Sequence, residues 1–167
     1  MKDAYILIGG NIGDRQAYLS AAATLIAESM GKIRHFSSVF ETAAWGMAGQ
    51  GDFLNQVLLI ETSLSPLELL HSLLSAEQEL GRFRTGKYGP RTIDMDILFY
   101  DQWIVSIPGL QVPHPRIPER RFVLEPMLEL APDLRHPVLN RTIRQLHQSC
   151  PDKLPVHKYN DAVHNKA

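Results

Sequence analysis

The sequence predicts an α+β fold in which helices pack on one sheet. Two segments have the apolar spacing of amphipathic helices, and each begins at a capping residue and ends at a glycine. Runs of β-branched, aromatic and other apolar residues with strand character lie before, between and after these segments. The resulting order, β-α-β-β-α-β followed by shorter pieces, is that of a split-βαβ, ferredoxin-like sheet.

The first half of this pattern is a strand, a helix and a strand. Ala4–Ile8 is a short run with strand character that stops at Gly9. Asp14 is placed to cap the following helix, whose apolar residues recur at i, i+3, i+4, i+7 and i+11, and Gly31 lies just past its end. Residues 32–42, KIRHFSSVFET, have good strand propensity with a mixed pattern, so we expect one strand here.

The second half contains a strand, a helix and a strand. Phe53–Thr62 holds a continuous apolar run, which is typical of a strand covered on both faces. Ser65 and Pro66 open the second helix, which closes at Gly81. Ile93–Tyr100 is the next predicted strand.

Proline limits regular structure toward the end of the chain. Seven of the eleven prolines fall within residues 108–137, so we expect short elements there. One helix is predicted near Arg120–Leu130, interrupted by Pro126, and another within Thr142–Ser149.

Composition and organisation exclude several classes of protein. No repeat or linker divides the chain, so we predict one domain over residues 1–155 and a polar, loose tail over residues 156–167. The 17 Lys and Arg residues nearly balance the 18 Asp and Glu residues, which argues against nucleic acid as a partner. A single cysteine, Cys150, excludes an intramolecular disulfide and a cysteine-rich zinc site. With neither a signal peptide nor an apolar stretch of 18 residues, we expect a cytoplasmic protein without a membrane partner, and a monomer.

The segment with the clearest chemical character is GPRTIDMDIL, residues 89–98. Because side chains alternate on a strand, Asp94 and Asp96 point to one face, and Met95 and its apolar neighbours point to the other. The Cα atoms of the two aspartates are then roughly 7 Å apart, so both carboxylates can reach the same one or two hard cations. Mg²⁺ accepts such carboxylates and completes its coordination with water and substrate phosphates. The alternative is a merely solvated strand face, although aspartate is depleted in strands.

A cluster of cations precedes this strand. The loop RFRTGKYGPR has no acidic residue and contains four cations, Arg82, Arg84, Lys87 and Arg91, with Tyr88 among them. Cations beside paired carboxylates suit a polyphosphate, because phosphoryl transfer depends on positioning and charge neutralisation. The alternative is a solvated loop. The segment is not a P-loop, because tyrosine takes the place of the final Ser or Thr and a helix precedes it.

Two further groups of side chains could bind a ligand. His114 lies between two prolines in PHPR, with Arg120 close in sequence. Four aromatic residues and one amide could hold a flat heteroaromatic ring, namely Trp45, Phe53, Tyr88, Phe122 and Asn55. Each group also has a structural interpretation, since a lone histidine or a set of aromatic residues is often part of a core.

Five segments together resemble one family. They are IGGNIGD near the start, FETAAWG, FLNQV, GPRTIDMDIL and VPHPRIPERRFVLEPMLELAP, and the resemblance extends from residue 3 to about residue 150. The family is that of the 6-hydroxymethyl-7,8-dihydropterin pyrophosphokinases of folate biosynthesis. The resemblance implies a three-layer αβα arrangement on the ferredoxin-like core. It also implies that the terminal pyrophosphoryl group of ATP is transferred to the hydroxymethyl oxygen of the pterin, leaving AMP.

The resemblance also implies a role for each site residue. Asp94 and Asp96 would bind two Mg²⁺ ions between ATP and the acceptor hydroxyl, and Arg82 and Arg91 would steady the phosphates. The ATP site would be lined by Glu77, Arg84, Lys87, Ile97, Gln111, His114 and Arg120. The pterin site would be lined by Thr42, Ala43, Trp45, Phe53, Asn55, Tyr88 and Phe122. The loops 43–51 and 82–91 would close over both substrates and exclude water.

Two other functions are weighed against this one. A palm-like nucleotidyltransferase would also use paired strand aspartates, but it needs a third carboxylate and a nucleic-acid groove, and the sequence offers neither clearly. A non-catalytic ferredoxin-like module that binds a ligand or RNA would not need two aspartates beside four cations. The base for the acceptor hydroxyl is open between His114, a metal-bound water and none.

Overall fold

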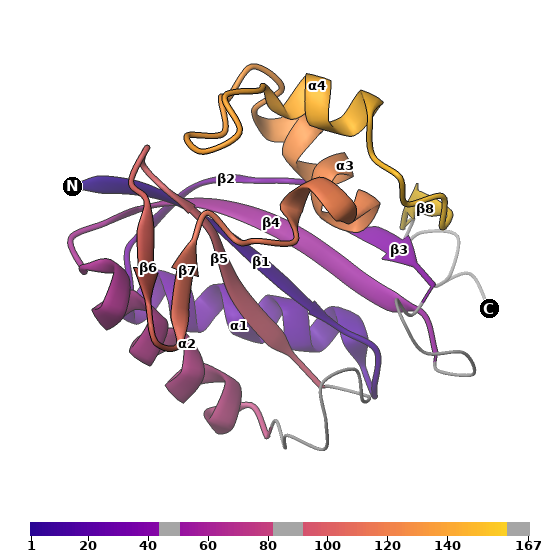
Figure 1. Cartoon of the computed structure of the whole chain (residues 1–167). Coiled ribbons are helices and arrows are strands. Elements are labelled where there is room, and N and C mark those ends of the chain that lie inside the picture. The colour runs from indigo at the N-terminus through magenta and orange to yellow at the C-terminus, as the bar shows by residue number, and fades with distance from the viewer. Residues whose placement is uncertain (44–50, 82–91, 160–167) are drawn as a thin grey trace.

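One antiparallel sheet of six strands organises the part of the chain that the computed structural model describes, namely residues 1–43, 51–81 and 92–159 (Figure 1). Its strands are β1 (Lys2–Gly10), β2 (Lys32–Phe36), β3 (Phe40–Thr42), β4 (Phe53–Thr62), β5 (Asp94–Tyr100) and β8 (Val156–Lys158). The order across the sheet is β5-β1-β4-β3-β8, and β2 pairs with the other half of β4, on the same side as β3. A separate hairpin is made of β6 (Val105–Ile107) and β7 (Leu110–Val112).

Helices cover both faces of this sheet (Figure 1). The helices are α1 (Arg15–Ser29) and α2 (Pro66–Glu79) on one face, and α3 (Arg121–Leu130) with α4 (Ile143–Gln148) on the other, where the 3₁₀ turn η1 (Ile117–Glu119) leads into α3. None of the helices described here is long and apolar enough to cross a membrane.

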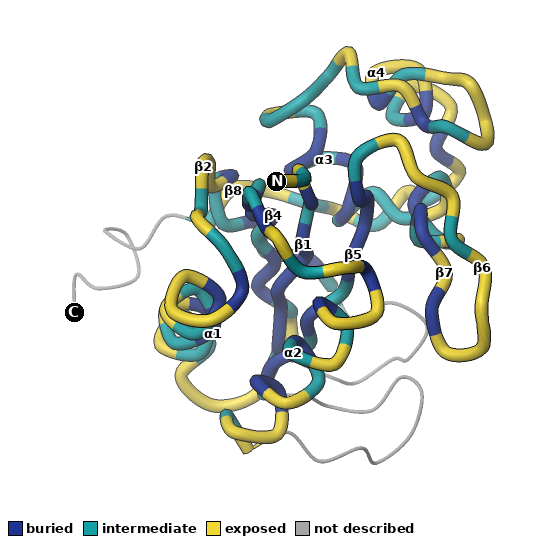
Figure 2. Tube along the Cα trace, turned by 90° about the vertical axis from the view of Figure 1, so that its left-hand side faces the viewer, coloured by how far each residue is buried: buried dark blue, intermediate teal, exposed yellow. Residues whose placement is uncertain are grey.

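Alternate residues of the central strands enter two different cores. On β4, Val57 packs with apolar residues of α3 and α4, and Leu58 packs with those of α1 and α2. Figure 2 shows the central strands as the buried part of the chain, between helices whose outer sides are exposed. The predictions of a mixed α and β fold and of a strand covered on both faces at residues 53–62 are thus confirmed.

The predicted helix starts are confirmed at their caps. Asp14 Oδ1 accepts a hydrogen bond from the Ala17 N–H (3.1 Å) at the start of α1, and Ser65 and Glu68 form a reciprocal capping box at the start of α2. The prediction that Pro126 interrupts the third helix is wrong, because α3 continues through it. The proline removes one main-chain hydrogen bond, and burial of the apolar side of α3, including Pro126 itself, offsets that loss.

Residues 32–42 form two strands where the sequence predicts one. Ser37, which is 3% exposed, lies between β2 and β3, and its Oγ accepts a hydrogen bond from the Val57 N–H (2.9 Å) while donating to the Ser38 carbonyl (2.8 Å). The Ser37 N–H donates to the Val57 carbonyl (2.9 Å). The side chain thus replaces one main-chain partner, and the strand can bend without leaving the buried Val57 amide unpaired.

Two other boundaries differ from the sequence prediction. β1 continues through Gly9 and Gly10, although the sequence predicts that this strand stops at Gly9. Val156–Lys158 pair with β3 as strand β8, so the expected loose tail is wrong for this segment. Edge pairing is made by main-chain groups, and a polar composition therefore does not reveal it. Residues 160–167 lie outside the described part of the chain, and the domain boundary stays a prediction.

Replacing Ser37 with alanine should lower the free energy of unfolding by about 1–3 kcal/mol, because the buried Val57 N–H would lose its acceptor. Ser106→Ala is the control, since it makes the same change at an exposed position of a strand, β6. Urea unfolding followed by circular dichroism measures both variants. Equal stability of the two variants would contradict this role of Ser37.

Candidate active site

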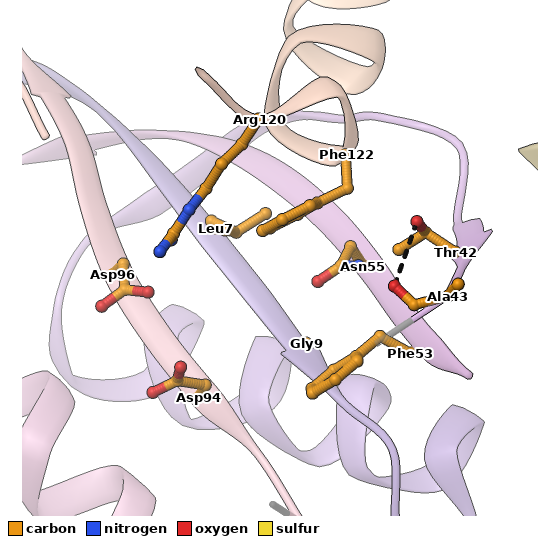
Figure 3. Close-up of a pocket in the computed structure, with 10 residues that line it drawn as sticks. All are labelled: Leu7, Gly9, Thr42, Ala43, Phe53, Asn55, Asp94, Asp96, Arg120 and Phe122. Atoms are coloured by element: carbon orange, nitrogen blue, oxygen red, sulfur yellow. Dashed lines mark hydrogen bonds between the residues drawn. The ribbon is translucent and has the colours of Figure 1, made fainter. Parts of the chain in front are cut away.

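A pocket lies on the α3 side of the sheet, at the ends of β1, β4 and β5 (Figure 3). The register of the strands assembles it: Gly9 pairs with Asn55 on one side and with Asp94 on the other. Two residues back along β1, Leu7 pairs with Asp96 of β5. The residues that line the pocket are Leu7, Gly9, Thr42, Ala43, Phe53, Asn55, Asp94, Asp96, Arg120 and Phe122.

Two carboxylates form one side of this pocket. Asp94 and Asp96 are partly exposed, whereas Met95 and Ile97 are buried, as the alternation of side chains on β5 predicts. Glu77 of α2 supports this strand, since its Oε2 accepts a hydrogen bond from the Met95 N–H (2.7 Å). Glu77 is 3% exposed and does not belong to the lining of this pocket, although the resemblance implies a place for it at the ATP site.

An amide forms the opposite side. Asn55 is 4% exposed, and its Nδ2 has no hydrogen-bond partner within the described ranges, so a buried donor is available to a ligand. Gly9 makes room for this side chain, because a Cβ at Gly9 would collide with Asn55 Oδ1 and lie 2.9 Å from the Leu54 carbonyl oxygen. Sequence reasoning missed Gly9 as well as Leu7. A glycine inside a strand was the available sign of a close approach, but it lay beyond the predicted strand end.

Two aromatic rings and two β3 residues complete the amide side. Phe122, from the start of α3, and Phe53, from the start of β4, lie on opposite sides of a space that Asn55 borders (Figure 3). Thr42 and Ala43 lie next to this space at the end of β3, and Thr42 pairs with Phe53. Rings placed in this way can hold a flat heteroaromatic ligand between their faces, while the amide hydrogen-bonds to the polar edge of that ligand.

A second pocket adjoins the first at Asp96, which lines both. It is formed mainly by β5 and the β6–β7 hairpin, and its lining includes three residues expected at the ATP site: Ile97, Gln111 and His114. Arg120, which is also expected at the ATP site, lines the first pocket instead and extends toward Asp96 (Figure 3). The carboxylate pair thus lies where the two pockets meet.

His114 lines the second pocket as a neutral side chain. Its Nδ1 accepts a hydrogen bond from the Arg116 N–H (3.1 Å), which leaves the ring proton on Nε2. Burial, and then the nearby Arg120 guanidinium, lower the pKa of His114 to about 4, although Asp94 acts in the opposite direction. At neutral pH the ring is therefore a hydrogen-bond donor through Nε2 and carries no charge.

Several predicted site residues lie outside the described part of the chain: Trp45, Arg82, Arg84, Lys87, Tyr88 and Arg91. Within the described ranges, no group of three or more His, Cys, Asp or Glu side chains could hold a metal ion, so Asp94 and Asp96 stand as a pair. Such a pair suits a cation whose remaining ligands come from water or from a bound phosphate.

Sequence comparison relates most of the chain to one family. Residues 5–132 match the family model described as 7,8-dihydro-6-hydroxymethylpterin-pyrophosphokinase (HPPK). The 2-amino-4-hydroxy-6-hydroxymethyldihydropteridine pyrophosphokinase of Aquifex aeolicus (strain VF5) is 40% identical over 145 residues, which are 87% of this chain and 90% of that protein. The protein of the same name from Bacillus subtilis (strain 168) is 44% identical over 128 residues, 76% of this chain and 77% of that protein.

Longer proteins contain a similar part. The folic acid synthesis protein fol1 of Schizosaccharomyces pombe is 39% identical over 92% of this chain, which spans 21% of that protein. Among solved structures, a Plasmodium falciparum HPPK-DHPS triple mutant with STZ-DHP superposes with a TM-score of 0.73 at 17% identity, over 88% of this chain and 43% of that chain. At this identity the likeness concerns the fold.

Lowering the pH should destabilise the folded protein in part through His114. Because its pKa is about 4 in the folded state and about 6.5 in the unfolded chain, only the unfolded state takes up the proton between these values. The stability contributed by the neutral ring is therefore fully present above pH 6.5 and is lost as the pH falls toward 4. His114→Asn should reduce that loss by roughly 1–3 kcal/mol.

Urea unfolding at pH steps from 7.5 to 4 in the presence of EDTA measures this effect. His136, whose pKa burial also lowers, is retained in both proteins and contributes equally to both profiles. Identical profiles for His114→Asn and the unmodified chain would contradict the assignment.

Proposed function

The chain belongs to the 7,8-dihydro-6-hydroxymethylpterin-pyrophosphokinase family, and on this premise we propose that it transfers the pyrophosphoryl group of ATP to 6-hydroxymethyl-7,8-dihydropterin in folate biosynthesis. The hydroxymethyl oxygen forms a bond to the β-phosphorus, the bond from that phosphorus to the oxygen of the α-phosphate breaks, AMP leaves, and the hydroxyl proton is released. The observation that carries the proposal is one pocket that joins an aromatic and amide slot to a pair of carboxylates, one of which, Asp96, also lines a second pocket.

The pterin binds between Phe53 and Phe122 in this proposal. Its fused rings present flat faces to the two phenyl rings, and its polar edge meets Asn55, whose buried Nδ2 donor lacks a partner in the described structure. Thr42 and Ala43 border the same edge. The hydroxymethyl group then points away from Asn55, toward the carboxylates on β5.

The nucleotide occupies the second pocket, next to Ile97, Gln111 and His114. Its phosphates extend toward Asp96, the residue common to both pockets, and toward the Arg120 guanidinium. His114 stays uncharged and donates a hydrogen bond through Nε2, so it binds an oxygen without adding a positive charge. Both substrates thus meet at the carboxylate pair, and their reacting groups are held close together.

Magnesium fits the residues present. Two carboxylates on one strand face, with no third acidic or histidine ligand within the described ranges, suit Mg²⁺, which commonly takes one or two carboxylates and completes its shell with phosphates. Asp94 and Asp96 would hold the expected two ions, and bound Mg²⁺ would neutralise charge that builds on the phosphate oxygens. Within the chain, Arg82 and Arg91 are proposed to add further positive charge to this region.

The expected fold class, oligomeric state and location are part of the same proposal. The assignment of the βαββαβ part to the ferredoxin-like class within a three-layer arrangement agrees with the strand order β5-β1-β4 and the helices on both faces. A monomeric state and a cytoplasmic location stay predictions.

Incubation of the chain with Mg²⁺-ATP and 6-hydroxymethyl-7,8-dihydropterin should yield AMP and the pterin diphosphate in equal amounts, as measured by ³¹P nuclear magnetic resonance. Asp96→Asn should lower kcat by about 10³-fold, because it removes half of the carboxylate pair where the two pockets meet. Asp133→Asn, a change of the same kind at an exposed position, is the control. Formation of ADP and a pterin monophosphate would contradict the reaction, and full activity of Asp96→Asn would contradict the role of the pair.

Gly9→Ala should weaken binding of the pterin by about tenfold or more, because the added Cβ would displace Asn55, while ATP-analogue binding stays within about twofold. In the control Gly51→Ala, the new Cβ meets the Asn11 carbonyl oxygen at an ordinary 3.5 Å. Isothermal titration with a non-hydrolysable ATP analogue and Mg²⁺ measures both affinities. Unchanged pterin affinity in Gly9→Ala would place the pterin elsewhere.

A further inference from the structure

Arg15 joins the two strands that carry the pterin side of the pocket. It is the first residue of α1, and its Nη1 donates to Glu41 Oε2 of β3 (2.8 Å) and to the carbonyl oxygen of Asp52, just before β4 (2.9 Å). Asn11 adds a contact nearby, since its Nδ2 donates to the Gly51 carbonyl (3.1 Å). Arg15 and Asn11 therefore connect the start of α1 and the turn before it to β3 and to the residues just before β4.

Arg15 makes these contacts from the face of the sheet opposite the pocket. Glu41 pairs with Leu54, which packs in the core under α1 and α2. The next pair on the two strands, Thr42 with Phe53, lines the pocket on the other face. A ligand in the pocket therefore does not touch Arg15, and any effect of Arg15 on binding must pass through the strands.

Strand β8 covers the outer edge of this arrangement. His157 pairs with Glu41, and its Nε2 lies 3.5 Å from Glu41 Oε1. The Tyr159 ring lies 5.6 Å from the Arg15 guanidinium carbon, and the Tyr159 N–H donates to the Val39 carbonyl (2.8 Å). These neighbours leave the Arg15 side chain 24% exposed and that of Glu41 14% exposed, so the pair is partly shielded from water.

We propose that Arg15 is a positioning residue for pterin binding, a proposal that rests on the function proposed above. By bonding to Glu41 and to the Asp52 carbonyl at once, the planar guanidinium fixes the relative placement of β3 and the start of β4. Thr42 and Ala43 on one strand and Phe53 and Asn55 on the other then keep the spacing that the pterin needs. Binding sites are sensitive to such spacing at the scale of a fraction of an ångström.

The test compares Arg15→Gln with Arg34→Gln. Arg34 also ties two strands of this sheet together, since its Nη1 lies 2.7 Å from Glu61 Oε2 and joins β2 to β4, but it lies at the end of β4 away from the pocket. For each variant, isothermal titration gives the Kd of 6-hydroxymethyl-7,8-dihydropterin in the presence of Mg²⁺ and a non-hydrolysable ATP analogue, and the Kd of the analogue alone. Thermal unfolding gives the Tm, and all titrations are made well below it.

Arg15→Gln should raise the pterin Kd by about tenfold and change the analogue Kd by less than about twofold, whereas Arg34→Gln should change neither by more than about twofold. Adding Glu41→Gln to Arg15→Gln should add less than about twofold, because both changes break one connection. If Arg15→Gln does not fold, Glu41→Gln alone should raise the pterin Kd by about threefold and change the analogue Kd by less than about twofold.

Unchanged pterin affinity in Arg15→Gln would overturn this proposal alone. Equal losses of pterin and analogue affinity would also overturn it, since they would indicate a general structural role. An unmodified chain that binds the ATP analogue but no pterin would overturn the proposed function, and the positioning role with it.

Discussion

The hydrogen bonding of β1 to β4 on one side and to β5 on the other fixes the position of the site. This pairing places Gly9 between Asn55 and Asp94, so the amide and a carboxylate lie on the two strands that flank β1 and face the same side of the sheet. A slip of β5 by one residue would turn Asp94 and Asp96 into the core and bring Met95 out. The two apolar cores oppose that slip, because Met95 packs on one face while Leu98 packs on the other. Burial that stabilises the sheet therefore also places the side chains of the proposed site.

The same pairing gives the pocket its width. Neighbouring strands lie about 4.8 Å apart, so the main chains at Asn55 and Asp94 are separated by about 10 Å, with Gly9 midway. That span accommodates two fused six-membered rings together with a substituent that reaches the carboxylates. Without a side chain at Gly9, the floor between the amide and the carboxylates stays open to a flat molecule. The strand register thus separates the aromatic and amide end of the pocket from the carboxylate end, where we propose that phosphoryl transfer takes place.

The elements of the fold that depend on local sequence could be predicted. The caps at Asp14 and Ser65, the apolar run on β4 and the alternation around Asp94 and Asp96 each follow from residues close together in the chain. The features that the sequence did not reveal depend on distant partners. Ser37 replaces a main-chain partner of Val57, β8 pairs with β3, and Gly9 yields space to Asn55. In each case the residue type permits the contact, but only the pairing of strands determines which group it meets.

Two segments flank the pocket, β3 and the start of α3, and an arginine side chain holds each of them in place. The strands β1, β4 and β5 pair over long ladders, whereas β3 has only three residues and the N-cap residue of α3 makes no capping hydrogen bond with its side chain. Arg15 holds β3 from the far face of the sheet, and Arg121 holds the start of α3, where its N–H donates to Asp152 Oδ2 (3.0 Å) and its Nε to the Asp152 carbonyl (3.0 Å). Arg120 has no side-chain hydrogen bond that caps α3, so Asp152 takes over that role for the adjacent N–H. Arg120 and Phe122, on either side of Arg121, both line the pocket. Each of these two segments is thus held by an arginine that lies outside the pocket lining and bonds to residues distant in the sequence.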